Sequence, residues 1–310
     1  MADWCVDALI IISNNRLRPR AIRNVALWCP YSIYGDVTVD YNTHTANGSG
    51  IGSVVDEGGG VWKFTTPPGV IEFDVLVFAA GGGGSPGSGG RGGDLFNASE
   101  GGKGGNGGNG GGVSVETFYP APGQIYYINI GVGGLAGVGG FGGHDDEDCP
   151  NEGGMVSGTA GGNSDFGGTT SVGGAPGTMN WGCSSGGDFN PANPSTGGAM
   201  GGRGNEGSTG ENGLNNSYST GGIGSQGTTR DGGGAGGGGA GHMAGGNASS
   251  GSSTAGNGGP GAGGGGGGGG HGGDYGSDGG AGGNSGAGGN GRVIIDMSRT
   301  YTPTTQDTWC

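Results

Sequence analysis

The sequence predicts a mostly irregular and β fold: a bundle of polyglycine-II helices clamped by a small antiparallel β-sandwich, with a separate small N-terminal module. Polyglycine-II helices are left-handed helices of the polyproline-II type. Two observations lead to this prediction. Glycine supplies 94 of the 310 residues, against an average usage of roughly 7%, and most of these glycines lie between residues 81 and 290. The two ends of the chain have a more ordinary composition and carry strand patterns.

Residues 1–60 are predicted to form an attachment and docking module. Val37–Tyr41 has the pattern of a strand, and Ala8–Ile12 suits a buried strand or the start of a helix. The module also contains a cluster of basic residues within eight positions, namely Arg16, Arg18, Arg20 and Arg23. These arginines are candidates for docking onto another molecule, although a solvated face with acidic neighbours is the simpler explanation of such a charge run.

Residues 61–135 are predicted to form the β-sandwich frame together with the first glycine helices. Val61–Thr65 and Val70–Phe78 are strand patterns separated by a Pro-Pro-Gly turn. Within the second pattern one face is apolar and the other acidic: Ile71, Phe73, Val75 and Val77 alternate with Glu72 and Asp74. Val113–Tyr119 and Ile125–Ile130 are two further predicted strands.

Residues 136–290 are predicted to form the polyglycine-II bundle with recognition loops. Large apolar side chains are too sparse here to build a side-chain core, which excludes a doubly wound fold, a barrel enzyme or a helical bundle. Gly-Gly-X triplets run through residues 101–112 and, nearly unbroken, through residues 279–290. This period of three matches the polyproline-II-type helix. Glycine on the inward edges lets such helices approach closely and bond N–H to C=O between neighbours.

A flexible linker is the alternative for a glycine block, and the regular triplets favour the bundle. In the bundle, the run Gly263–Gly270 would lie in the interior, and the X residues of the triplets (Asn, Ala, Ser, Lys) would face solvent. Residues 291–310 are predicted to hold a closing strand, Arg292–Asp296, and a C-terminal tail.

Three separated motifs resemble the glycine-rich tail domains of phages. Phe64–Val70 followed by a strand and Ala79–Gly84 is similar to the opening of those domains, Pro122–Gly134 to their second strand, and Gly289–Ile295 to their closing strand. The resemblance covers about residues 61–297 and keeps the order of the motifs. It implies a polyglycine-II sandwich like that of tail-fibre tip adhesins of T-even-like phages, whose N-terminal part attaches to the fibre and whose loops contact the host receptor. Residues 1–60 match no such attachment module.

Segments poorer in glycine interrupt the block near residues 94–100, 144–157, 178–196, 212–231, 242–257 and 271–278. In a bundle these inserts would be the turns and end loops. Several of them carry an aromatic residue that is a candidate for receptor binding: Trp181, Phe189, Tyr218, Tyr275 and Phe96. Exposed aromatic side chains on a rigid scaffold are typical recognition anchors. The alternative is that each aromatic residue caps the bundle and seals it from water.

Signals for catalysis are nearly absent from the sequence. There is no phosphate-binding GxxxxGK[ST] motif, and GxGxxG matches arise by chance in so glycine-rich a chain. We therefore expect neither enzymatic activity nor a cofactor. The acidic run His144–Asp148 contains a weak calcium candidate formed by Asp145, Asp146 and Asp148. It lacks the spacing of an EF-hand loop, so an exposed acidic loop is favoured.

Charge and cysteine content limit the partners and the place of synthesis. The formal net charge of −14 argues against nucleic acid or an anionic membrane as the main partner. No apolar run has the length of a membrane span, and no export signal is visible. The five widely spaced cysteines predict mostly reduced thiols, with a Cys149–Cys183 bridge as the alternative for that pair.

Together these patterns predict a non-enzymatic virion protein, made in the host cytoplasm without a signal peptide. We expect a phage tail-fibre or tail-tip adhesin. It would contact other virion proteins through residues 1–60 and a host cell-surface protein or glycan through its loops. The alternatives are a virion surface or decoration protein without receptor binding, and a glycine-rich ice-binding protein.

Overall fold

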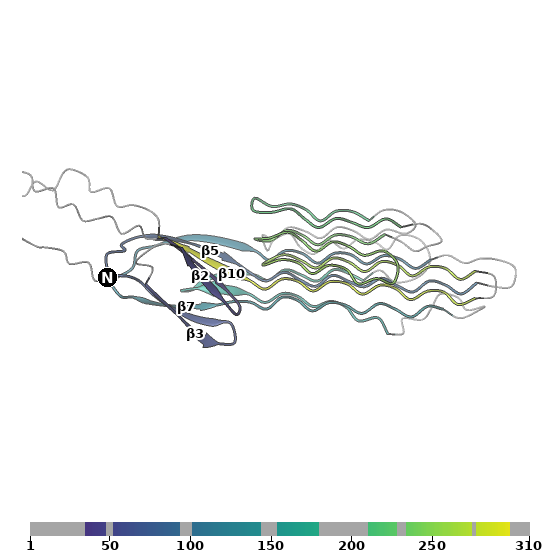
Figure 1. Cartoon of the computed structure of the whole chain (residues 1–310), viewed down its shortest axis with the longest axis horizontal. Coiled ribbons are helices and arrows are strands. Elements are labelled where there is room, and N and C mark those ends of the chain that lie inside the picture. The colour runs from purple at the N-terminus through teal and green to yellow at the C-terminus, as the bar shows by residue number, and fades with distance from the viewer. Residues whose placement is uncertain are drawn as a thin grey trace, which may run out of the picture.

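Two stacked β-sheets form one end of the molecule, and extended glycine-rich segments run away from them side by side (Figure 1). The structure, a computed structural model, describes residues 35–47, 52–93, 101–143, 154–179, 210–227, 234–274 and 277–297. In these residues the secondary structure is β, the remaining backbone is irregular, and there is no helix. The predicted mostly irregular and β fold is therefore confirmed.

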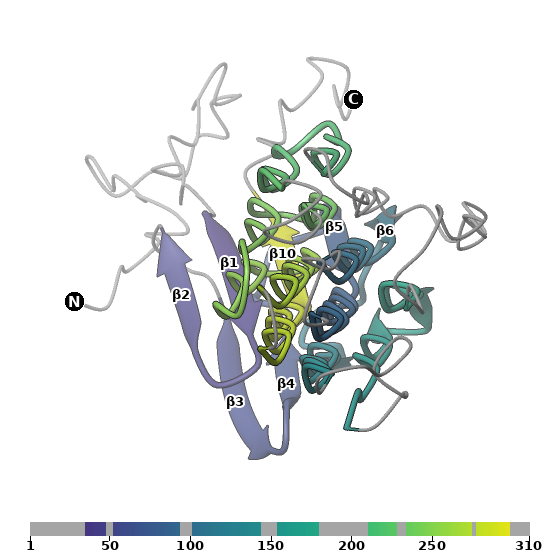
Figure 2. The same cartoon turned by 90° about the vertical axis from the view of Figure 1, so that its right-hand side faces the viewer.

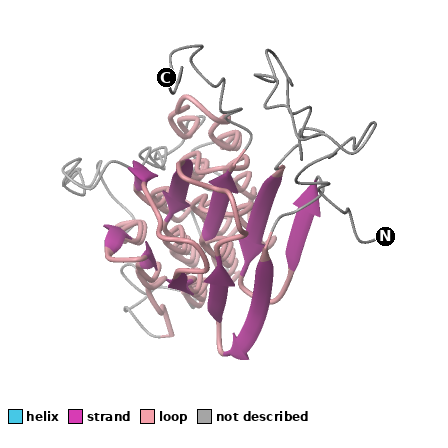
Figure 3. Cartoon of the chain, turned by 90° about the vertical axis from the view of Figure 1, so that its left-hand side faces the viewer, coloured by secondary structure: helices cyan, strands magenta, loops and turns pink. Residues whose placement is uncertain are grey.

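Each sheet has five antiparallel strands (Figure 3). The first sheet has the order β2-β1-β10-β5-β6 and the second the order β3-β4-β7-β8-β9. The strands are β1 (Asp36–Asp40), β2 (His44–Asn47), β3 (Ser53–Gly58), β4 (Val61–Thr65), β5 (Phe73–Phe78), β6 (Val113–Phe118), β7 (Ile125–Asn129), β8 (Ser164–Phe166), β9 (Thr169–Ser171) and β10 (Arg292–Asp296).

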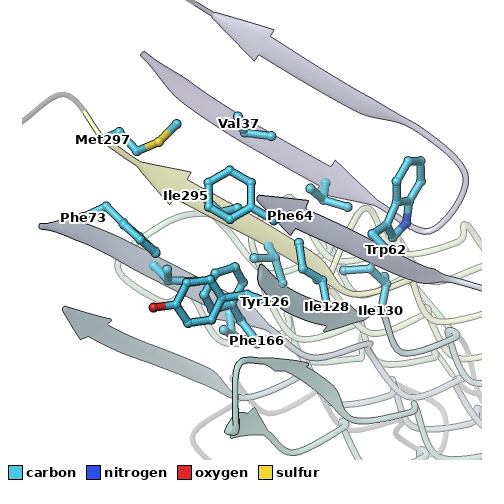
Figure 4. Close-up of a cluster of buried hydrophobic side chains, with 14 of the residues drawn as sticks. Val37, Trp62, Phe64, Phe73, Tyr126, Ile128, Ile130, Phe166, Ile295 and Met297 are labelled. Atoms are coloured by element: carbon cyan, nitrogen blue, oxygen red, sulfur yellow. The ribbon is translucent and has the colours of Figure 1, made fainter. Parts of the chain in front are cut away.

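The core of the sandwich lies between the inner faces of the two sheets (Figure 4). Val75 and Val77 of β5 pair with Ile295 and Val293 of β10, and all four side chains are fully buried. Aromatic side chains from the other sheet complete this core, with the rings of Phe64 and Phe73 packed edge to face at 5.8 Å. The predicted alternation is thus confirmed for Phe73, Val75 and Val77. It is wrong for Ile71, which is 58% exposed because it precedes the first residue of β5.

The predicted boundary at residue 60 falls inside this sandwich. β1 pairs with β10, and β3 pairs with β4 on the other side of that boundary. Residues 36–58 thus supply three strands to the two sheets. Residues 1–34 lie outside the described residues.

The glycine-rich segments leave the sheets and return to them in alternation (Figure 1). Residues 79–93 continue from β5, and residues 101–112 lead back into β6; in the same way residues 130–143 continue from β7 and residues 277–291 lead into β10. We call the set of these segments the glycine array. Its described segments are 79–93, 101–112, 130–143, 154–163, 172–179, 210–216, 219–227, 234–241, 244–250, 253–259, 262–274 and 277–291.

Backbone hydrogen bonds between these segments repeat every third residue. Successive donors of segment 79–93 that point to the same neighbour are three residues apart, and so are their acceptors. The N–H groups of Gly81, Gly84, Gly87 and Gly90 donate to the carbonyls of Gly289, Gly286, Gly283 and Gly280 over 2.8–3.0 Å. Seen end-on, the segments are triangular coils (Figure 2).

Segment 79–93 lies at the centre of a closed ring of six neighbours. It donates hydrogen bonds to three segments that run in the opposite direction: 101–112, 154–163 and 277–291. It accepts hydrogen bonds from three that run in its own direction: 130–143, 172–179 and 262–274. Segment 262–274 is the centre of a second such ring, which shares 79–93, 101–112 and 277–291 and adds 234–241, 244–250 and 253–259.

The predicted interior position of Gly263–Gly270 is confirmed, because every residue of this run is buried. A Cβ atom added at Gly266 would overlap the carbonyl oxygen of Gly105, and one at Gly264 would overlap that of Gly286. Glycine is needed here because the neighbouring backbones are already in contact.

The expectation that the X residues of the triplets face solvent is only partly correct. Ala281 and Asn284 are exposed, as expected. In segment 101–112, by contrast, Lys103 is 4% and Asn106 is 6% exposed. The reason is that this segment is bonded to neighbours on several sides (79–93, 172–179, 234–241 and 262–274), which leaves little of its circumference open to solvent.

Candidate functional site

Two of the predicted recognition loops, 94–100 and 144–157, follow array segments at the end of the glycine array that points away from the sheets (Figure 1). Segments 79–93, 130–143 and 262–274 reach this end at the same level, because Gly143 donates to the carbonyl of Gly90 and Gly273 to that of Arg91. The chain then enters the predicted inserts 94–100 and 144–157. The array therefore brings the residues that precede these inserts to one end of a rod-like scaffold.

The prediction of an end loop at residues 242–257 is wrong, because His242 lies in a turn at the sheet end and residues 244–250 and 253–257 belong to array segments. The described residues of the predicted insert 271–278 belong instead to array segments 262–274 and 277–291.

Most of the predicted site residues lie outside the described residues. This applies to the receptor-binding candidates Phe96, Trp181, Phe189 and Tyr275, to the docking candidates Arg16, Arg18, Arg20 and Arg23, and to the calcium candidates Asp145, Asp146 and Asp148. Tyr218 is the one receptor-binding candidate that the structure describes.

Tyr218 lies at the sheet end of the array, opposite the end that carries the inserts. Its ring packs edge to face on Phe78 of β5, with ring centroids 4.9 Å apart, and its side chain remains 44% exposed. The prediction that residues 212–231 form an end loop is therefore wrong for residues 212–227, and residues 228–231 lie outside the described residues. Residues 212–216 and 219–227 belong to two array segments joined by a turn.

Asparagine explains why that part of the array looked like a loop in the sequence. In segment 210–216, Asn212 and Asn215 stand three residues apart, as the X residues of triplets do. Their Oδ1 atoms accept hydrogen bonds from the N–H groups of Gly224 and Gly221, at 2.8 and 2.9 Å. Side-chain oxygens thus replace a missing neighbour at the margin of the array. A search for asparagine at a period of three could have found these segments.

The same arrangement recurs around the array. Asn284 and Asn290 accept from the N–H groups of Gly139 and Gly133, and Asn247 accepts from that of Ile223. Outer N–H groups would otherwise form open edges to which another chain could add. The asparagine side chains close these edges without a further segment.

A cluster of side chains fastens the array to the first sheet. Phe78 lies under Tyr218 and also under His242, whose ring centroid is 4.7 Å away. His242 Nδ1 is 2.9 Å from Nη1 of Arg292, and Arg292 forms a two-bonded ion pair with Asp40 at 2.6 and 2.9 Å. Because a guanidinium can only donate, His242 is neutral here and accepts through Nδ1.

The surroundings of His242 disfavour its charged form. Burial lowers the pKa of His242, the adjacent Arg292 guanidinium lowers it further, and Asp40 opposes both effects. Together with Phe78 and Tyr218, this cluster forms a junction between the first sheet and the array. Its charged groups are already used in contacts between β1, β10 and the turn at His242.

Within the described ranges, no group of three or more His, Cys, Asp or Glu side chains is placed to hold a metal ion. No helix in this part of the chain is long and apolar enough to cross a membrane. No protein-family model matches the chain, and a search of curated proteins found no match either.

Proposed function

We propose that the glycine array is a polyglycine-II bundle. The ladders repeat every third residue along each segment, and two segments each have six hydrogen-bonded neighbours, as close packing of three-fold helices requires. In the described array, glycines with left-handed φ angles are confined to chain turns and segment ends, such as Gly251 and Gly261. Regular φ angles near −75° in the segments would accord with this geometry.

We further propose that the protein is a non-enzymatic virion component, namely a phage tail-fibre or tail-tip adhesin. One observation carries this proposal: the two ends of the molecule differ in structure, with the sheets at one end and the tips of the array segments at the other. The described chain begins and ends at the sheets, where the N–H of Met297 donates to the carbonyl of Gly35 at 3.2 Å. Segments 79–93 and 130–143, which precede two of the predicted inserts, stop at the opposite end. Attachment to other virion proteins through residues 1–60 would therefore leave the inserts facing outward.

The inserts would then bind a host cell-surface protein or glycan. They provide loops on a backbone-bonded scaffold, the arrangement in which recognition residues are usually found. The net charge of −14 supports a partner other than nucleic acid. On this proposal the protein is made in the host cytoplasm and works in the virion.

Particle adsorption to host cells tests this function with two matched aromatic variants. Trp181→Ala removes the candidate anchor with the largest contact area, and we expect about 2 kcal/mol of lost affinity, or about thirtyfold. Tyr218→Ala removes a ring at the sheet junction. It should lower the melting temperature and leave adsorption unchanged. The proposal fails if Trp181→Ala adsorbs normally or if Tyr218→Ala alone abolishes adsorption.

A further inference from the structure

A row of exposed apolar side chains runs along the marginal segment 130–143, which is the lowest long trace in Figure 1. The side chains are three residues apart and 50% to 69% exposed: Val132, Leu135, Val138 and Phe141. Val156 of the adjacent segment 154–163 is 56% exposed, and the two segments are paired at Val138 and Val156. We call these five residues the apolar row.

The position of the row follows from the packing of its segment. A Cβ atom at Gly134 would meet the backbone of Thr159, and one at Gly133 would meet that of Gly288. Glycine therefore fills the other two positions of each triplet except at Ala136, and the position occupied by Val132 and Leu135 carries the large side chains, which are exposed. Small or polar residues would satisfy this constraint equally well, so packing within one chain does not explain the large apolar ones.

We propose that the apolar row is the contact surface for a second copy of this chain. The first argument is electrostatic. The protein carries a net charge of −14, so most contacts between two copies bring like charges together. Segments 130–143 and 154–163 contain no Asp, Glu, Lys, Arg or His. Two copies can meet along these segments with little repulsion and little charge desolvation.

The second argument is the regular spacing of the row. Three residues of a polyproline-II-type helix rise about 9.3 Å, so the row is a series of evenly spaced knobs. Two identical rows displaced by half a repeat can interdigitate, whether they run parallel or antiparallel. A two-fold dimer needs such a self-complementary surface. The spacing itself is set by packing within one chain, and a second copy necessarily has the same spacing.

The third argument is the length of the apolar surface. Ile125 and Tyr127 of β7 are also more than half exposed and extend the apolar surface along the same stretch of chain. The row is roughly 30 Å long from Val132 to Phe141, and β7 extends it to roughly 50 Å, where Lys63 is the strand partner of Tyr127.

Sedimentation equilibrium of the full chain tests the proposal. We expect a dimer at about 50 µM. The double variant Leu135→Ser/Phe141→Ser should weaken association at least about tenfold. The matched control Leu214→Ser/Ile223→Ser removes two side chains that are 51% and 63% exposed on other segments of the array. It should associate like the wild type. A monomeric wild type, an unaffected apolar-row variant, or equal loss in both variants would overturn the proposal.

Salt dependence gives a second measurement that needs no variant. Because segments 130–143 and 154–163 are uncharged and each copy is acidic overall, added salt should screen repulsion and strengthen the dimer. Association that weakens with salt would show that ion pairs hold the copies together, and would contradict the proposal. Neither measurement involves host binding, so its outcome is independent of the adhesin function.

Discussion

Single side chains complete the hydrogen bonding of the array where the backbone alone leaves an N–H group without a direct carbonyl acceptor. Ser285 is an example. The N–H groups of Gly134 and Gly140 donate directly to the carbonyls of segment 79–93. Between them, the N–H of Gly137 donates to Ser285 Oγ at 2.6 Å, and the hydroxyl donates to the carbonyl of Gly84 at 2.6 Å. The fully buried serine thus relays one bond of the ladder. The sequence showed only an interruption of the triplets.

His242 should make the stability of the protein depend on pH. Its pKa is lowered in the folded state, mainly by burial, so between that value and the ordinary pKa of about 6.5 the unfolded chain binds more protons. The contribution to stability is fully present above pH about 6.5 and is lost as the pH falls towards the folded-state pKa. We expect the melting temperature to decrease from pH 7 to pH 5.5, and to decrease less in His242→Gln. Equal slopes in the two proteins would show that His242 is not the group responsible.

At the scale of elements, strands were predictable where an apolar face is buried. Val61–Thr65 and Arg292–Asp296 are found as predicted. β2 has four exposed residues, so no apolar alternation marked it. β8 and β9 have three residues each and lie inside the glycine block. Their turn, Gly167–Gly168, has left-handed φ angles of 56° and 101°, and a Gly-Gly pair between short polar runs is a recognised hairpin signal.

We expect an added side chain to destabilise the protein much more in an interior segment of the array than at its margin. Gly266→Val forces a side chain against the backbone of Gly105, and we expect a loss of at least about 3 kcal/mol in the free energy of unfolding. Ala281→Val adds bulk at an exposed position of segment 277–291 and should change it by less than about 0.5 kcal/mol. Chemical denaturation measures both. Similar values for the two variants would contradict close packing around Gly266.

On the scale of the whole molecule, the prediction from sequence falls furthest short of the structure in specifying which glycine segments are neighbours. The triplets predicted that glycine segments pack together, but not which segments become neighbours, because glycine has no side chain to specify a partner. The pairing is set by the sheets: strand order fixes where segments 79–93, 101–112, 130–143 and 277–291 begin or end. Of the candidate site, the sheet-end positions of Tyr218 and His242 were not predictable, because polar X residues made array segments look like loops in the sequence.

Hydrogen exchange at the amides of Gly263–Gly270 tests most directly the claim that backbone bonds between segments hold the array together. These groups are buried and, at Gly264, Gly266, Gly267 and Gly270, donate to carbonyls of neighbouring segments over 2.8–3.0 Å. We predict protection comparable to that of Val75 and Ile295 in the sandwich core, because opening one interior amide requires separation of several segments. Exchange at the rate of an unstructured glycine chain would contradict the account.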